Sequence, residues 1–212
     1  LMPPIEVVDK LRQSALHDTA NRYQSYRGIP QLRQAFARWY NRHFDVSLNS
    51  EEEVLPLIGS KEGIMHIAMS FLQEGDQALV PDLGYPAYAM TTKLAGATPV
   101  NYKLEENNGW KPRFEVLEAM DLTKVKIMWL NYPNMPTGAK ADITFFEELV
   151  SFAKKHEILL VHDNPYAFII NDEPFSLLSV DGAKEVAIEL NSLSKCFNMA
   201  GWRVGVMTGG QE

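Results

Sequence analysis

The sequence predicts an α/β fold of three layers, in which a mostly parallel seven-stranded sheet lies between two layers of helices. Short apolar runs of strand length alternate along the chain with segments in which apolar residues recur at helical spacing. This alternation is typical of a parallel sheet whose faces are covered by helices. The chain contains no internal repeat, low-complexity tract or evident linker. We therefore expect residues 1–212 to form one domain.

Each expected strand is a short apolar run bounded by turn-forming residues. The strands are Val54–Ile58, Gln77–Val80, Thr98–Tyr102, Val125–Asn131, Ile158–Asp163, Val186–Leu190 and Arg203–Thr208. Each expected helix has apolar residues spaced so that they share one face. The helices are Ile5–Ala15, Gln31–Phe44, Lys61–Leu72, Tyr85–Leu94, Phe114–Met120 and Ile143–His156. The polar segment 105–109 is expected to be a surface turn.

Composition and charge argue against several classes of protein. Hydrophobic residues make up 46% of the 212 residues and charged residues 22%, which is typical of a globular chain with a sizeable core. The net charge of −7 argues against a nucleic-acid surface, although a few local donors would suffice to bind one phosphate. No apolar run reaches the roughly 20 residues that cross a bilayer, and no signal-peptide pattern is present. The single cysteine, Cys196, excludes an intrachain disulfide and fits a reducing compartment, so we expect a cytoplasmic protein.

The segment that follows Asn191 carries the strongest chemical pattern. Lys195 lies where a strand is expected to give way to a helix, directly after Ser192 and Ser194 and shortly before Arg203. A lysine amine can form an imine with an aldehyde and then act as an acid or base. Serine hydroxyls and the planar arginine fork are good partners for a phosphate. Taken alone, the pattern also fits a solvated lysine beside a loop of small residues.

A second pattern ends the strand that precedes Pro165. Asp163 would place a carboxylate at the floor of a pocket, where it could pair with a ring nitrogen, and Pro165 would turn the chain so that Tyr166 faces back. The alternative is an aspartate that caps a short helix, with Tyr166 in the core. The residues alone leave both interpretations open.

Three weaker patterns also follow expected strands. Ser60 and Lys61 lie at a helix start, where free N–H groups and the helix dipole favour an anion. Segment 131–138, with two prolines and a glycine, predicts a rigid turn. Tyr85 could stack on a planar ring, although an aromatic residue there is more often part of the core.

In this order, the patterns resemble those of a fold-type I pyridoxal-phosphate (PLP) enzyme of the class I/II aminotransferase family. The motifs are Tyr-x-x-Tyr-x-Gly, Gly-Ser-Lys-Glu, Tyr-Pro-x-Tyr, Pro-Thr-Gly, Asp-x-x-Tyr, Ser-x-Ser-Lys and Arg-Val-Gly, from Tyr23 to Gly205. The resemblance implies an aminotransferase that uses pyridoxal 5'-phosphate, acts on an amino acid and a 2-oxo acid, and forms a homodimer. It also implies that residues 1–212 are its PLP-binding large domain, truncated at both ends and without the C-terminal small domain.

The resemblance assigns roles to individual residues. Lys195 would carry PLP as a Schiff base and move a proton between the substrate and the cofactor. Asp163 would pair with the pyridinium nitrogen, and Tyr166 would donate to the phenolic oxygen. Tyr23 would reach the phosphate in the neighbouring subunit. The other expected cofactor contacts are Ser60, Lys61, Tyr85, Ser192, Ser194 and Arg203.

The sequence departs from the family pattern at Met135, where the family usually has an asparagine that bonds the phenolic oxygen. A thioether cannot donate a hydrogen bond. We therefore expect Tyr166 to be the direct side-chain donor to that oxygen, with Met135 packed near the ring edge. The competing possibility is that the turn shifts and places Asn134 in the slot.

Several alternatives share this cofactor machinery. The resemblance also covers carbon–sulfur β-lyases, synthases and decarboxylases, as well as transcription regulators that sense PLP through a non-catalytic domain. A phosphate-binding module without PLP would leave Lys195, Asp163 and Tyr166 unexplained. Because the family grips the substrate carboxylate with an arginine of the small domain, we expect residues 1–212 alone to be a poor transaminase. The sequence does not specify the amino-acid substrate.

Overall fold

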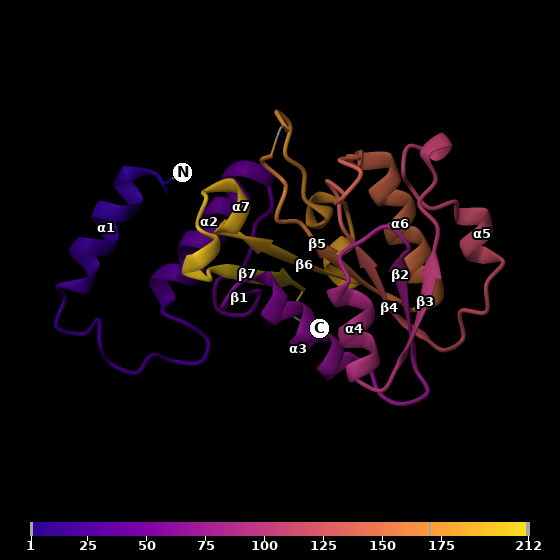
Figure 1. Cartoon of the computed structure of the whole chain (residues 1–212), viewed down its shortest axis with the longest axis horizontal. Helices are drawn as coiled ribbons and strands as arrows, with labels where there is room; N and C mark the ends of the chain where they lie inside the picture. Colours follow the sequence, from indigo (N-terminus) through magenta and orange to yellow (C-terminus); the bar gives the residue numbers. More distant parts are fainter. Residues whose placement is uncertain (1, 170, 211–212) are drawn as a thin grey trace.

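The computed structural model describes residues 2–169 and 171–210, and its strands form a single seven-stranded sheet (Figure 1). The strand order is β1-β7-β6-β5-β4-β2-β3. Strand β7 runs antiparallel to both of its neighbours, β1 and β6, and all other neighbouring pairs are parallel. The strands are β1 (Val54–Leu57), β2 (Gln77–Pro81), β3 (Thr98–Tyr102), β4 (Val125–Leu130), β5 (Leu159–Asp163), β6 (Ala187–Ser192) and β7 (Gly205–Gly209). The predicted α/β class and mostly parallel sheet are confirmed.

The helices lie close to their predicted positions. They are α1 (Ile5–Ala15), α2 (Pro30–Phe44), α3 (Ser60–Phe71), α4 (Ala87–Leu94), α5 (Phe114–Glu118), α6 (Ile143–His156) and α7 (Leu193–Cys196). The short 3-10 turns are η1 (Glu106–Asn108), η2 (Leu177–Ser179), η3 (Ala183–Glu185) and η4 (Ala200–Trp202). Helix α4 begins two residues later than predicted because Pro86 disfavours a helical conformation at Tyr85.

The predicted strand stops two residues short of the end of β6, and the helix expected to begin near Lys195 is the short α7, for which the pattern gave no range. Strand β6 continues past Leu190 because Asn191 and Ser192 pair with Val206 and Gly205 of β7, although both residues are polar. Ser192 then caps α7, its hydroxyl accepting a hydrogen bond from the Ser194 N–H. The pattern of apolar residues could not show the last two residues of β6 or the bounds of α7, because the side chains there are mostly polar.

Two buried clusters lie on opposite faces of the sheet and hold the helices against it. The first cluster includes Tyr40 of α2 and Phe146 of α6. The second includes Ile64 of α3, Tyr88 of α4 and Trp129 of β4. The sheet is therefore buried on both faces, as expected for parallel strands joined by helices.

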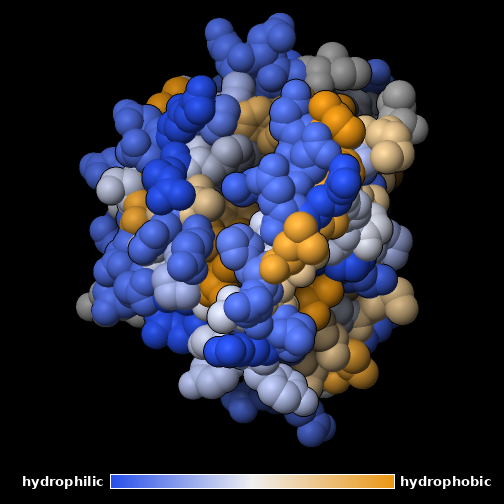
Figure 2. All heavy atoms as spheres, turned by 90° about the vertical axis from the view of Figure 1, so that its left-hand side faces the viewer, coloured by the Kyte–Doolittle hydropathy of each residue, from blue (hydrophilic) through white to orange (hydrophobic). Residues whose placement is uncertain are grey.

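The N-terminal segment extends away from this body (Figure 1). Helix α1 has no buried residue, and the face that carries it is mainly hydrophilic with separate hydrophobic spots (Figure 2). Arg33, buried in α2, ties the end of the segment to the body. Its guanidinium donates to the Gly28 carbonyl at 2.6 Å, to the Ser50 carbonyl at 3.0 Å and to Glu51 Oε2 at 2.7 Å. Arg33 thus fixes the point from which the segment leaves the body.

We predict that Arg33→Met destabilises the protein by about 1–3 kcal/mol, because partly buried carbonyls and Glu51 lose their donor. The same change should accelerate tryptic cleavage at Arg27, whose carbonyl also accepts from Arg33 at 3.3 Å. Arg38→Met is the matched control, since Arg38 is an exposed residue of the same helix. Urea unfolding and timed proteolysis measure both effects. If Arg33→Met and Arg38→Met have the same free energy of unfolding and the same rate of tryptic cleavage, Arg33 does not hold the segment to the body.

Candidate active site

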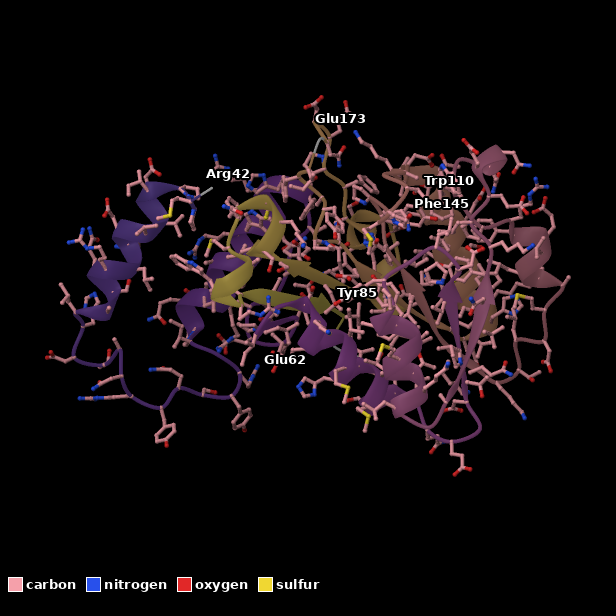
Figure 3. The ribbon with its side chains drawn as sticks, viewed as in Figure 1. Arg42, Glu62, Tyr85, Trp110, Phe145 and Glu173 are labelled. Atoms are coloured by element: carbon pink, nitrogen blue, oxygen red, sulfur yellow. The ribbon has the colours of Figure 1, made fainter. Side chains whose placement is uncertain are left out.

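A pocket of about 210 Å³ lies at the carboxyl ends of β4, β5 and β6, beside the first turn of α3. Ligands of open α/β sheets bind at this edge. Tyr85, one of the lining residues, lies near the centre of the molecule (Figure 3). The lining residues are Ser60, Lys61, Tyr85, Tyr88, Asn131, Met135, Asp163, Pro165, Tyr166, Ser192, Ser194, Lys195, Ala200 and Arg203. Every predicted site residue except Tyr23 is therefore in one place.

Asp163 is the last residue of β5 and its side chain is buried, with a relative exposure of 5%. Tyr88 donates a hydrogen bond to its Oδ2 at 2.8 Å, whereas Oδ1 has no partner among the residues that the structure describes. Asn131 Nδ2 donates to the Asp163 carbonyl at 2.8 Å. Burial raises the pKa of the Asp163 carboxyl to about 6, and the Tyr88 hydrogen bond and the neighbouring His162 oppose part of that rise. A cationic N–H group in the pocket would satisfy both the free oxygen and the charge.

The other end of the pocket has the features of an anion site. Helix α3 begins at Ser60, directly after Gly59, whose φ is 83°. A Cβ at Gly59 would lie 2.3 Å from Arg203 Nη2, so glycine lets the guanidinium lie against the helix start. The hydroxyls of Ser192 and Ser194 are 2.9 Å apart in the same pocket. A cation, two hydroxyls and a helix N-terminus suit a phosphate group.

A second glycine, Gly205, lets β7 lie close to β6 and to the start of α3. A Cβ at Gly205 would lie 2.9 Å from the Ser60 nitrogen and from the Asn191 carbonyl oxygen. Any larger residue would push β7 away from β6 and from the start of α3. Gly205 therefore helps to bring Arg203, Ser192 and Ser60 to one site.

Lys195 lies in α7 and its side chain faces the same pocket as Asp163 and Tyr166. Its Nζ is 6.0 Å from the centre of the Tyr166 ring. The next residue, Cys196, is partly buried, and burial raises the pKa of its thiol to about 11. Its Sγ donates to the Ser192 carbonyl at 3.5 Å. Lys195 thus presents an amine to an electrophile in the pocket, and Cys196 is a packed thiol.

The turn at 131–138 presents Met135 to the pocket and keeps Asn134 out of it. Asn134 is buried, and its Oδ1 accepts hydrogen bonds from the Thr137 hydroxyl at 2.8 Å and the Thr137 N–H at 3.3 Å. Its Nδ2 donates to the Leu83 carbonyl at 3.3 Å. The side chain of Asn134 is thus engaged within the turn.

Sequence reasoning missed Tyr88 and Asn131, which both line the pocket. Tyr88 lies three residues after Tyr85 in the Tyr-Pro-x-Tyr motif, and this short spacing was a signal that both rings belong to one site. Tyr23 is fully exposed on the N-terminal segment and lies outside the pocket of its own chain.

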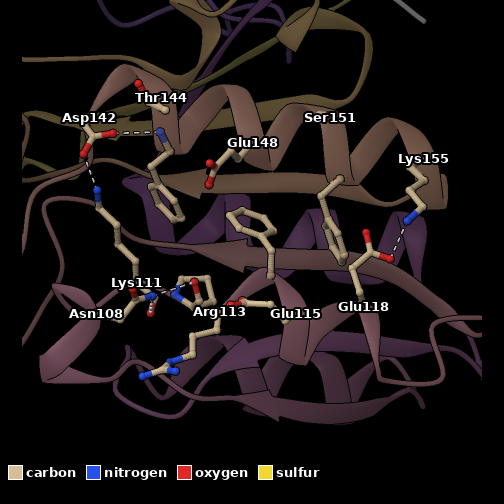
Figure 4. Close-up of a pocket in the computed structure, with 14 residues that line it drawn as sticks. Asn108, Lys111, Arg113, Glu115, Glu118, Asp142, Thr144, Glu148, Ser151 and Lys155 are labelled. Carbon is tan, nitrogen blue, oxygen red and sulfur yellow. Dashed lines mark hydrogen bonds and ion pairs between the residues drawn. The ribbon is translucent and has the colours of Figure 1, made fainter.

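A larger hollow of about 960 Å³ lies elsewhere, between α5 and α6 (Figure 4). Each cationic residue of its lining is already paired with a carboxylate, and the floor is aromatic. The pairs are Lys111 with Asp142, Arg113 with Glu105 and Lys155 with Glu118. Such a surface has neither a buried unpaired group nor a free cation to bind a charged substrate.

Across residues 2–169 and 171–210, no helix combines the length and the apolarity that a membrane span requires. The same residues contain no cluster of three histidine, cysteine, aspartate or glutamate side chains placed to hold a metal ion.

The sequence profile of the family described as aminotransferase class I and II matches residues 1–212. A curated LL-diaminopimelate aminotransferase of Dehalococcoides mccartyi is 47% identical over 211 residues, which are 99% of this chain and 54% of that protein. One from Aquifex aeolicus is 42% identical over 214 residues, covering 100% of this chain and 55% of that protein. The chain thus spans about half the length of the curated relatives it matches.

Solved structures share the fold over the whole chain. The apo-BacF structure from Bacillus subtilis superimposes with a TM-score of 0.96 at 42% identity and covers 100% of this chain and 54% of that one. An aromatic aminotransferase from Pyrococcus horikoshii gives a TM-score of 0.93 at 26% identity, with 100% of this chain and 56% of that one covered.

We predict that Asp163→Asn stabilises the ligand-free protein at pH 8 and not at pH 4. The folded-state pKa of about 6 lies above the ordinary value of 3.8, so the folded protein keeps a proton that the unfolded chain releases between these values. The free energy of unfolding therefore falls as the pH rises from about 4 to about 6, by up to about 3 kcal/mol for two pH units. Asparagine carries no charge and avoids this loss.

Urea unfolding of the ligand-free protein at both pH values measures the effect. Asp181→Asn is the control, since Asp181 is exposed. If the Asp163→Asn variant is less stable than the parent by the same amount at both pH values, the ionised Asp163 carboxylate does not destabilise the folded protein, and the prediction is wrong.

Proposed function

Because this chain belongs to the class I and II aminotransferase family, we propose that it binds the cofactor of an enzyme that transfers an amino group between an amino acid and a 2-oxo acid. The observation that carries the proposal is the composition of one pocket. It combines the Lys195 amine, the free Oδ1 of Asp163 and an anion site beside Arg203. These are the partners that an aldehyde, a protonated ring nitrogen and a phosphate require.

The cofactor that fits these residues is pyridoxal 5'-phosphate. Bound there, it would supply an aldehyde carbon and an electron-withdrawing ring. The unpartnered Asp163 Oδ1 supports this choice, because a buried acceptor without a donor is costly unless a ligand satisfies it. Gly59, which lets the Arg203 guanidinium lie against the start of α3, supports it at the phosphate end.

Asp163 would hold the proton on the ring nitrogen, and Tyr85 would pack against the ring face. Arg203 would form charge-assisted hydrogen bonds to the phosphate. The other phosphate donors would be the hydroxyls of Ser192 and Ser194 and the backbone N–H groups of Ser60 and Lys61.

Two side chains would handle protons. Burial, followed by the negative charge of Asp163, raises the pKa of Tyr166, so its hydroxyl stays protonated and can donate to the phenolic oxygen. Lys195 would bind the aldehyde and then, once released, move a proton at the substrate's α-carbon.

The substrate and the subunit arrangement also belong to this proposal. LL-diaminopimelate is the first amino acid to test, because it gives its name to curated relatives that are 47% and 42% identical to this chain. We further propose a homodimer in which Tyr23 donates to the phosphate in the neighbouring subunit. The full exposure of Tyr23 on a segment that extends from the body supports this role.

We predict that borohydride reduction of the protein mixed with PLP attaches the cofactor to Lys195. Lys195→Ala should abolish the covalent adduct, whereas Lys140→Ala should retain it because Lys140 is exposed and does not line the pocket. Peptide mass mapping locates the reduced lysine. An adduct on another lysine in the parent protein would contradict the assignment.

A further inference from the structure

Tyr88 is a fully buried residue in the first turn of α4, and its hydroxyl reaches across to the carboxylate at the end of β5. We infer that Tyr88 is a positioning residue that fixes the Asp163 carboxylate so that Oδ1 faces the ring nitrogen of the cofactor. The inference rests on the proposed function. It assigns a role in the site to a residue that would not itself touch the reacting atoms.

The two oxygens of Asp163 differ in a way that Tyr88 explains. Oδ2 accepts from the Tyr88 hydroxyl at 2.8 Å, and Oδ1 has no partner within the described part of the chain. The terminal torsion of an aspartate is broad, so an untethered carboxylate would rotate. A single hydrogen bond to Oδ2 is sufficient to define which oxygen remains open to the pocket.

The Tyr88 hydroxyl can position another group because its own ring is held on two sides. The ring stacks on Trp129 of β4 with centroids 5.3 Å apart and planes within 9°. The edge of Tyr85 meets it at 5.9 Å and 83°. The turn that leads into α4, in which the Tyr88 N–H donates to the Tyr85 carbonyl at 3.2 Å, therefore brings both rings to the pocket, with Tyr88 packed against the sheet.

Tyr88 is also a neutral hydrogen-bond donor. Burial, followed by the charge of Asp163, raises its pKa well above the ordinary value, so the hydroxyl stays protonated and neutral. A neutral donor stabilises the carboxylate without neutralising it, which leaves the negative charge available to a protonated ring nitrogen.

The other groups that face Asp163 come from several elements. Tyr88 and His162 lower its pKa, and Ser60 at the start of α3 lowers it further. The remaining titratable side chains of the pocket are Lys61, Tyr85, Tyr166, Lys195 and Arg203. Among these groups, Tyr88 makes the largest contribution that opposes the effect of burial.

The alternative is that Tyr88 only fills the core between α4 and the sheet. Tyr88→Phe separates the two roles because it keeps the ring and removes the hydroxyl. Tyr102→Phe is the matched control: Tyr102 is a buried tyrosine whose hydroxyl donates to the Trp129 carbonyl at 2.7 Å and not to Asp163.

The experiment follows the Asp163 carboxyl carbon by NMR in the full chain, with the signal assigned through Asp163→Asn. Tyr88→Phe should raise the pKa of Asp163 by about one pH unit, the value of one hydrogen bond to a charged group. Tyr102→Phe should leave it unchanged. In the same samples, Tyr88→Phe should weaken PLP binding about tenfold by spectral titration, relative to the parent.

An unchanged pKa of Asp163 in folded Tyr88→Phe would overturn the inference. If Tyr88→Phe does not fold, 3-fluorotyrosine at position 88 keeps the ring and hydroxyl, and its stronger donor should lower the pKa; no shift would again overturn it. Borohydride trapping of the parent protein separates the two proposals. Trapping at Lys195 with no pKa shift defeats only the role of Tyr88, whereas no trapping at Lys195 defeats the proposed function.

Discussion

The site depends on one buried carboxylate with unequal oxygens. Asp163 ends β5 with one oxygen bonded to Tyr88 and the other without a partner in residues 2–169 and 171–210, and burial raises its pKa to about 6. An ionised carboxylate in that place is costly unless a cation or strong donor pairs with it. The pocket thus suits the ligand that we propose for it, with a protonated nitrogen at one end and an anionic group at the other.

Topology brings the partners of that carboxylate together. The parallel strands β4, β5 and β6 end at one edge, where Asn131, Asp163 and Ser192 follow one another across the sheet. The antiparallel strand β7 begins at the same edge, so that Arg203, which precedes it, meets the start of α3. The glycines at 59 and 205 allow these approaches, which a side chain at either position would obstruct.

Much of this arrangement could be predicted from the sequence, because strand ends and ordered motifs are local signals. Lys195, Asp163 and Arg203 follow or precede apolar runs, and the sheet brings them to one edge as expected. The bond between Tyr88 and Asp163 could not be predicted in the same way, since it joins residues 75 positions apart. Nor could the engagement of Asn134 within its own turn, which depends on contacts with Thr137 and Leu83.

The central claim is that Asp163 pairs with a protonated ring nitrogen. The most direct test is the 15N chemical shift of the ring nitrogen of labelled PLP bound to the full-length protein, with Asp163→Asn for comparison. We expect a protonated nitrogen at pH 8 in the parent protein and an unprotonated one in the variant. An unprotonated ring nitrogen in the parent protein at that pH would contradict it.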